Sequence, residues 1–338
     1  MFVNKNLTFR GLISFSGHHL VWLTAWMVTV TAGYQFFLQD WLSIPWFPIT
    51  VVGTAVAFYV GFKNNQAYDR LWEARKIWGA IVNSSRAWAS TVKGFVTNQF
   101  ADSPRSAEEL YAIRKQLIYR HIGWLYALRS QLLVSTSWEH INQNALVAKY
   151  TKRRQKTFGL GLLDDGETID HLKKFLPEAE YDRLVAHTNT ATQIIDQQSQ
   201  ELMHLRGEGL IDDFRHMELQ KILYDFYVHQ GKCERIKKFP LPRQYGGMSF
   251  VFVGIFIFIL PFGMASEFAK LGDLTLWLSV PFSILLGWVY LMMELVGDYS
   301  ENPFEGLGND IPMLALSRTI EIDLREMLGE TDLPPKIQ

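Results

Sequence analysis

Four stretches of the chain are mostly apolar and lack Asp, Glu, Lys and Arg. They cover residues 11–39, 41–62, 244–266 and 274–293. A helix needs about 20 mostly apolar residues to cross the hydrocarbon core of a bilayer. The pattern therefore predicts four transmembrane helices, two near each end of the chain.

The charged segment between these two pairs of stretches has apolar residues at helical spacing and only weak strand signals. The second apolar stretch continues without proline as far as Phe100, which predicts one long helix that leaves the membrane. Further helices are expected, the first with a capping box that starts at Ser106, and a glycine-rich loop is expected at 158–167. Their predicted ranges are 107–133, 178–187, 188–205 and 211–230. The expected fold is thus an all-α membrane protein with a large cytoplasmic helical region.

The positions of the basic residues predict the orientation. Lys5 and Arg10 precede the first stretch and many basic residues lie between the second and third, whereas the two short connections contain only Lys270. Segments rich in Lys and Arg stay in the cytoplasm. We therefore expect the protein to lie in the inner membrane with both termini in the cytoplasm. The expected division, by residue number, is 1–62 for the first two spans, 63–243 for the cytoplasmic helices, 244–293 for the last two spans and 294–338 for a cytoplasmic C-terminal segment.

Composition removes several classes of function. Charged residues make up 20% of the 338 residues and the net charge is −1, which argues against a general nucleic-acid binder. A single cysteine, Cys233, excludes an intrachain disulfide. Nucleotide-binding glycine motifs, H-E-x-x-H and paired C-x-x-C motifs are missing from the sequence, so neither an enzyme nor a cofactor is indicated. His18 and His19 are expected to be an interfacial pair rather than metal ligands, and Cys233 to be structural.

The second span is the least apolar of the four. Thr50, Thr54 and Phe58 recur every four residues and so share one helix face, among small residues such as Gly53. One interpretation is close packing between helices, which small residues permit. The other is the wall of a narrow and mostly apolar pore, which would need several copies of the chain in a ring.

Three strings are similar to a known family. They are FYVGFKNNQAYDRLWEARKIWG at 58–79, GKCERIKKFPLPRQY at 231–245 and ENPFEGLGNDIPMLALSRTIEIDLREML at 301–328. With the four spans, they resemble the bestrophin family of ion channels in its shorter bacterial form. The resemblance implies a ring-shaped homopentamer around one central pore, with the second helix of each subunit at a hydrophobic neck.

The resemblance also implies site residues. Thr50, Thr54 and Phe58 become the neck candidates, with Val51 and Phe62 next. A second constriction at the cytoplasmic mouth falls near the start of the 211–230 helix. Phe214 is the first choice there, and the alternatives are Leu210 and Ile211.

Two departures from the animal pattern affect the expected properties. Bulky apolar residues form the animal neck, whereas two threonines stand here. Animal members also hold calcium in an acidic run after Asn-Pro-Phe; here Asn302 and Asp310 remain, but Leu307 and Gly308 replace acidic residues. Fewer carboxylates mean lower affinity for a hard cation, so we expect weak calcium control or none, and no bound metal.

The sequence thus predicts a pentameric channel that passes small monovalent ions, with chloride as the family default. Its partners would be small inorganic ions, the lipid bilayer and further copies of itself. A sodium-selective channel of the same fold is an alternative. A membrane-anchored scaffold or sensor without conductance is another, and in that case the small residues of the second span would only pack.

Overall fold

The structure is a computed structural model that describes residues 9–37, 43–143, 145–158 and 172–337. Within these ranges the chain is helical and has no β-strand. The predicted all-α fold is therefore confirmed for the described residues. The loop expected at 158–167 lies outside them, apart from Phe158, which ends a helix.

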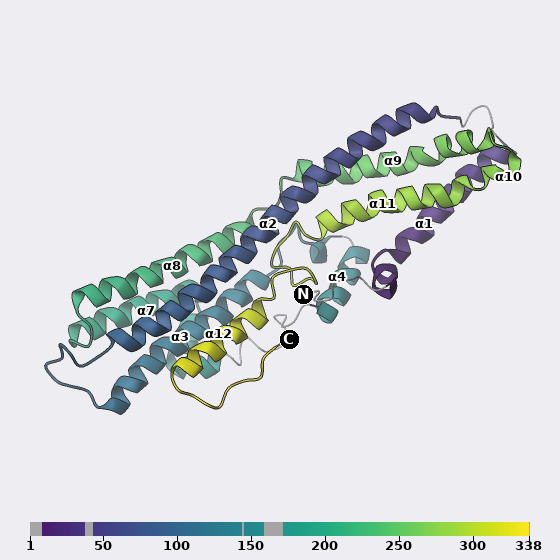
Figure 1. Ribbon diagram of the computed structural model, residues 1–338. Coiled ribbons are helices and arrows are strands. Elements are labelled where there is room, and N and C mark those ends of the chain that lie inside the picture. The colour runs from purple at the N-terminus through teal and green to yellow at the C-terminus, as the bar shows by residue number, and fades with distance from the viewer. Residues whose placement is uncertain (1–8, 38–42, 144, 159–171, 338) are drawn as a thin grey trace. The chain divides into compact units, whose positions relative to one another are not determined.

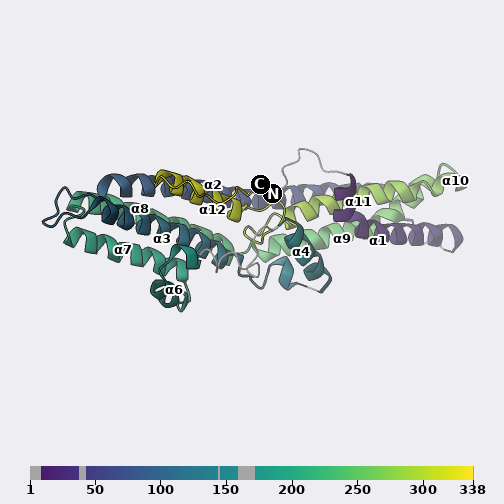
Figure 2. The same cartoon turned by 90° about the horizontal axis from the view of Figure 1, so that it is seen from below.

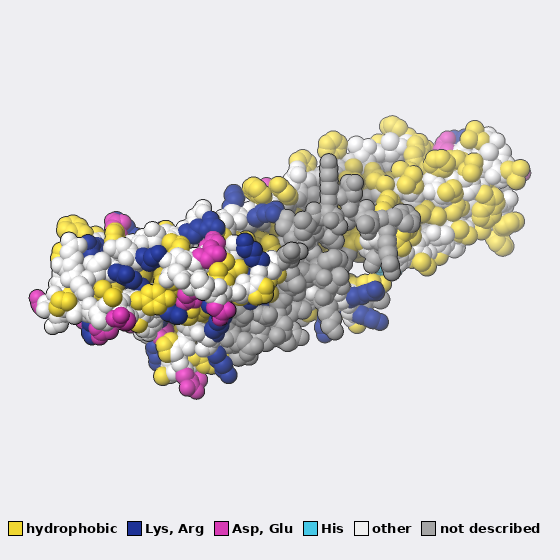
Figure 3. All heavy atoms as spheres, turned by 60° about the horizontal axis from the view of Figure 1, so that its bottom comes forward, with side chains coloured by type: hydrophobic (Ala, Val, Ile, Leu, Met, Phe, Trp, Pro, Cys, Tyr) yellow, Lys and Arg dark blue, Asp and Glu magenta, His cyan; other side chains and the backbone are white. Residues whose placement is uncertain are grey.

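The chain divides into two compact units. We call residues 2–70 and 240–302 the apolar unit, and residues 71–239 and 303–338 the polar unit. On the face seen in Figure 3, hydrophobic side chains cover much of the described part of the apolar unit, while Lys, Arg, Asp and Glu are spread over the polar unit. This contrast is the one that the sequence pattern predicts.

The apolar unit contains helices from both ends of the chain. They are α1 (Phe9–Phe36), the first part of α2 (Trp46–Phe95), α9 (Arg243–Ala269), α10 (Asp273–Leu276) and α11 (Ser279–Asp298). Helices α1, α9 and α11 contact one another and run side by side (Figures 1 and 2). Their shared core is apolar, with Leu23, Met27, Phe256, Leu260 and Leu291 almost fully buried.

Three helices in the described part of the chain are long and apolar enough to cross a membrane. These are α2, α9 and the segment 273–298, which includes α10 and α11. The first predicted span forms α1, which is not among the three. The fourth predicted span is divided, because α10 ends at Leu276 and α11 begins at Ser279. The number of four spans remains a prediction.

The polar unit is a bundle of long helices. It contains the rest of α2, α3 (Ala107–Leu133), the short η1 (His140–Asn142), α4 (Ala145–Phe158), α6 (Glu178–Val185), α7 (Thr190–Gly207), α8 (Asp213–Lys238) and α12 (Met313–Met327). Helix α3 contacts α7, α8 and α12. Trp78, Trp88 and Trp124 are fully buried in its core.

Several local predictions are confirmed. Helix α2 is one continuous helix of 50 residues. Helix α3 has the predicted bounds and the predicted capping box, in which Ser106 and Glu109 exchange hydrogen bonds. Helix α8 is longer than the predicted 211–230, since it begins after the N-cap Asp212 and continues to Lys238.

Candidate pore-lining site

One side of α2 is exposed along the apolar unit. The five side chains predicted for the neck all lie on this side: Thr50, Val51, Thr54, Phe58 and Phe62. Phe58 and Phe62 are 66% and 68% exposed. Spacings of three and four residues keep the five close to one face of the helix. We call this exposed and uncharged set of five residues the neck face.

The opposite side of α2 is packed against α9 and α11. Gly53, Val56 and Val60 are buried there. A Cβ atom on Gly53 would lie only 2.8 Å from the Phe256 ring, so this position needs a residue without a side chain. The Tyr290 hydroxyl donates a hydrogen bond of 3.0 Å to the Gly53 carbonyl. Close packing, the first interpretation of the small residues, therefore applies to the buried side of the helix.

The two threonine hydroxyls of the neck face are turned towards their own helix. Thr50 Oγ1 donates to the Trp46 carbonyl at 3.2 Å, and Thr54 Oγ1 donates to the Thr50 carbonyl at 2.9 Å. A hydroxyl that bonds the carbonyl four residues earlier is satisfied within the helix. Each threonine can then present its methyl group outward, so the neck face is less polar than its composition suggests.

A buried ion pair fixes α2 behind the neck face. Lys63 Nζ lies 2.5 Å from Glu294 Oε1, and these side chains are only 1% and 3% exposed. The second oxygen of Glu294 accepts a hydrogen bond from the Ser249 hydroxyl. Lys63 belongs to α2, Ser249 to α9 and Glu294 to α11. One carboxylate thus connects three helices of the apolar unit.

The predicted cytoplasmic constriction lies at the start of α8. Phe214 is in the first turn of this helix and is 82% exposed. Leu210 and Ile211 are each 1% exposed and belong to the core of the polar unit. Of these three candidates, Phe214 alone has a side chain that faces outward within its unit.

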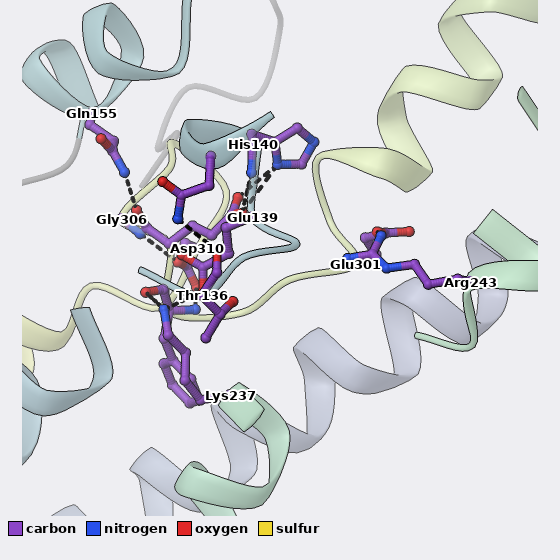
Figure 4. A network of polar contacts seen from close by, with 12 residues as sticks. Thr136, Glu139, His140, Gln155, Lys237, Arg243, Glu301, Gly306 and Asp310 are labelled. Carbon is purple, nitrogen blue, oxygen red and sulfur yellow. Dashed lines mark hydrogen bonds and ion pairs between the residues drawn. The ribbon is translucent and has the colours of Figure 1, made fainter. Parts of the chain in front are cut away.

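A second polar cluster, in the polar unit, holds the loop after Pro303 (Figure 4). The backbone N–H of His140 donates to Glu305 Oε1 at 3.0 Å, and His140 Nδ1 lies 2.9 Å from Glu305 Oε2. Lys237 Nζ lies 2.5 Å from Glu139 and also donates to the Phe304 carbonyl at 3.2 Å. Burial raises the pKa of Glu139, and the Lys237 ammonium opposes this increase.

Asp310 organises the same loop through the backbone. Its carboxylate accepts hydrogen bonds from the N–H groups of Phe304, Gly306 and Ile311 at 2.7 to 2.9 Å. Phe304 has a φ of 73°, a left-handed conformation that is unusual for a residue with a side chain. Burial raises the pKa of Asp310 to about 6, although the three N–H donors oppose the shift.

The chain matches a known protein family along most of its length. The family model described as "Bacterial/Fungal Bestrophin protein" matches residues 10–326. The protein belongs to this family. The resemblance seen in the three sequence strings is therefore confirmed across almost the whole chain.

Relatives of this bestrophin carry names that describe channels. The voltage-dependent anion channel-forming protein YneE of Escherichia coli K12 is 26% identical over 291 residues, which cover 86% of this chain and 79% of the relative. The voltage-dependent anion channel-forming protein RSc3414 of Ralstonia nicotianae is 28% identical over 302 residues, covering 86% and 83%.

A solved structure shows the same fold. A crystal structure of a bacterial bestrophin homologue from Klebsiella pneumoniae has a TM-score of 0.73 and 20% sequence identity to this chain. The match covers 93% of this chain and 98% of the other. At this identity the likeness concerns the fold alone.

The acidic residues near the end of α11 and in the loop after it bind other groups of the same chain. Glu294 pairs with Lys63, Glu301 lies 3.4 Å from Arg243, and Glu305 binds His140. Asp310, one of the two weak metal candidates, has its carboxylate turned to backbone N–H groups. The other candidate, Asn302, is 9% exposed. Among the described residues, no group of three or more His, Cys, Asp or Glu side chains could hold a metal ion.

Sequence reasoning missed the roles of Lys63 and Glu294. A signal was available, because each follows directly after an apolar stretch and the two have opposite charge. Charged residues within or next to a span usually face the bundle interior and pair with one another.

Three residues considered in the sequence analysis, Cys233 and the adjacent pair His18 and His19, take no part in the contacts described above. Cys233 is fully buried, and burial raises the pKa of its thiol, which keeps it protonated and unreactive. The rings of His18 and His19 in α1 have centroids 3.7 Å apart.

Proposed function

We propose that this bestrophin is a homopentameric channel for small monovalent anions in the cytoplasmic membrane. The neck face of α2 (Thr50, Val51, Thr54, Phe58 and Phe62) would line a hydrophobic neck, and Phe214 would line a second constriction. Symmetry would place five copies of each side chain around the central axis.

The observation that carries the proposal is the division of α2 into a packed side and an exposed, uncharged side. In the apolar unit, the buried side contacts Phe256 of α9 and Tyr290 of α11, while the five side chains of the neck face are exposed. A row of apolar groups with threonine methyls is suited to a constriction that gates by wetting and dewetting.

The anion assignment comes from the relatives, which are named voltage-dependent anion channel-forming proteins. Neck residues without charge do not by themselves select the sign of an ion, since selectivity needs fixed charges or oriented dipoles. The alternative that the experiment must distinguish is therefore a channel selective for sodium.

The membrane topology forms part of the proposal. Four spans would lie within residues 1–62 and 244–293, and residues 63–243 and 294–338 would be cytoplasmic with both termini. The basic residues on either side of the spans support this orientation.

The test is a reversal-potential measurement with purified protein in planar bilayers under asymmetric sodium chloride. An anion channel gives zero current close to the equilibrium potential of chloride. Zero current close to the sodium equilibrium potential would replace anion by cation selectivity. A protein that inserts and assembles but conducts no current would support the scaffold or sensor instead.

A further inference from the structure

Helix α4 has a strongly basic composition. Its 14 residues, ALVAKYTKRRQKTF, include five Lys or Arg and no Asp or Glu. Lys149, Lys152 and Arg153 are exposed, whereas Thr151 is 0% and Gln155 8% exposed. The helix therefore packs on the protein through one side and presents a cationic side to its surroundings. We call Lys149, Lys152 and Arg153 the basic face of α4.

Gln155 fastens α4 to the loop after Pro303. Its side-chain amide donates a hydrogen bond of 2.7 Å to the Glu305 carbonyl, and it reaches the loop from its helix in Figure 4. Glu305 is itself bound by His140, in the short helix η1 that precedes α4. Helix α4 is thus attached to the loop directly through Gln155 and indirectly through its contact with η1.

Chain connectivity limits the distance between this loop and the end of α11. Glu305 follows Asp298, the last residue of α11, by only seven residues, and seven extended residues span at most about 25 Å. Lys237, which binds the Phe304 carbonyl, precedes the first residue of α9, Arg243, by six residues. The loop that holds α4 is therefore separated by only a short length of chain from the end of α11, and Lys237, which binds this loop, by a short length from the start of α9.

We propose that the basic face of α4 binds the phosphate headgroups of anionic lipids at the cytoplasmic surface of the bilayer. That surface carries a negative potential, which attracts Lys and Arg within about one Debye length. The buried side of α4 is occupied by contacts with the protein, so the helix contacts headgroups without inserting an apolar face. The contact is electrostatic and salt releases it. The proposal depends on the membrane location of the protein and not on ion conduction.

The full-length protein with Ala145→Cys provides the probe. Ala145 is the exposed first residue of α4, and the native Cys233 is buried, so a thiol-reactive fluorophore labels the new cysteine alone. The labelled protein is reconstituted into vesicles of phosphatidylcholine, with or without one-third phosphatidylglycerol. Quenching by a nitroxide on the lipid headgroups reports whether α4 touches the surface.

The expected result is strong quenching in the anionic vesicles at low salt and weak quenching in phosphatidylcholine or at high salt. K149Q/K152Q should lower the ratio of bound to unbound α4 by roughly 25-fold at low salt, because each basic residue near an anionic surface contributes roughly fivefold. The matched control is K221Q/K232Q, which removes the same charge from exposed positions of α8. It should leave the quenching unchanged.

Three results would overturn the proposal. Equal quenching in neutral and anionic vesicles would show that the contact does not recognise anionic lipid. Equal losses in the two double variants would show a general charge effect rather than binding by α4. Loss of quenching on addition of inorganic phosphate at constant ionic strength would assign the basic face to a small soluble anion. Ion currents play no part in this readout, so a channel that fails to conduct leaves the test valid.

Discussion

At the scale of single residues, the proposed neck depends on which atoms of α2 face outward. The hydroxyls of Thr50 and Thr54 are satisfied by their own helix, and the Phe58 ring is exposed without a packing role in the apolar unit. Side chains that contribute little to the fold of one chain are available for contacts around a central axis. Replacement of Phe58 should therefore affect permeation rather than stability.

We expect Phe58→Ala to increase conductance or to hold the channel open, because it widens and wets the narrowest apolar part of the proposed neck. Its thermal stability in detergent should change by less than about 0.5 kcal/mol, as for other exposed positions. The matched control is Phe256→Ala, which removes a buried ring from the contact with Gly53 and should cost about 3–5 kcal/mol. A large loss of stability with unchanged currents in Phe58→Ala would make Phe58 a packing residue.

At the scale of helices, the Glu294 carboxylate sets how α2, α9 and α11 fit together. Lys63 on the buried side of α2 points away from the neck face, so their ion pair also fixes the rotation of α2 about its axis. A pair so well shielded from solvent is costly to break, because removal of one partner leaves an uncompensated charge.

Lys63→Met should destabilise the apolar unit by about 3–5 kcal/mol, whereas K63M/E294M should recover much of this loss, since it leaves no unpaired charge. Thermal unfolding in detergent measures both. The exposed pair between Arg86 and Asp323 provides the comparison, and Arg86→Gln should cost less than about 1 kcal/mol. If the single and double variants lost the same stability, the pair would have no role in holding the helices.

At the same scale, the C-terminal segment makes the stability of the fold depend on pH. Burial would raise the pKa of Glu330, but hydrogen bonds from Lys115, Tyr119 and Arg325 outweigh it and lower the pKa to about 2. These donors connect Glu330 to α3 and α12. Because the folded pKa is below the ordinary value of 4.5, Glu330 stabilises the fold above pH 4.5, and this contribution is lost as the pH falls towards 2.

Glu330→Gln should therefore lower the stability near neutral pH. The stability of the variant should also depend less on pH between 4.5 and 2. Tryptophan fluorescence of both proteins across that range measures the difference. Parallel curves for the two proteins would show that Glu330 does not titrate as described.

Local sequence signals predicted the helices better than the contacts between them. Ser106 and Glu109 are three residues apart, so their capping box could be seen in the sequence, as could the lack of proline along α2 after Pro48. Lys63 and Glu294 are separated by 231 positions, and their places next to two apolar stretches do not by themselves show which partner each one meets. The burial of Leu210 and Ile211 has the same cause, because it depends on the packing of helices far apart in sequence. The break between α10 and α11 was also hidden within one continuous apolar stretch.

At the scale of the whole molecule, one chain leaves an uncharged face of α2 exposed, and the proposal is that further copies complete it. The mass of the particle in mild detergent, after subtraction of bound detergent, should be five times the 39.0 kDa of one chain. Light scattering or native mass spectrometry gives this value. A monomer or a dimer would remove the ring on which the neck depends.

The most direct test of the central claim asks whether the neck face meets water or lipid. Thr54→Cys places a thiol on the proposed pore wall, and Val21→Cys places one on α1, where Val21 is 72% exposed. A membrane-impermeant, charged thiosulfonate reacts quickly with an ionised thiol in water and hardly at all with a thiol in lipid. We expect rapid modification of Thr54→Cys with a change in current, and no reaction at Val21→Cys. An unreactive Thr54→Cys in a protein that conducts ions would contradict this expectation.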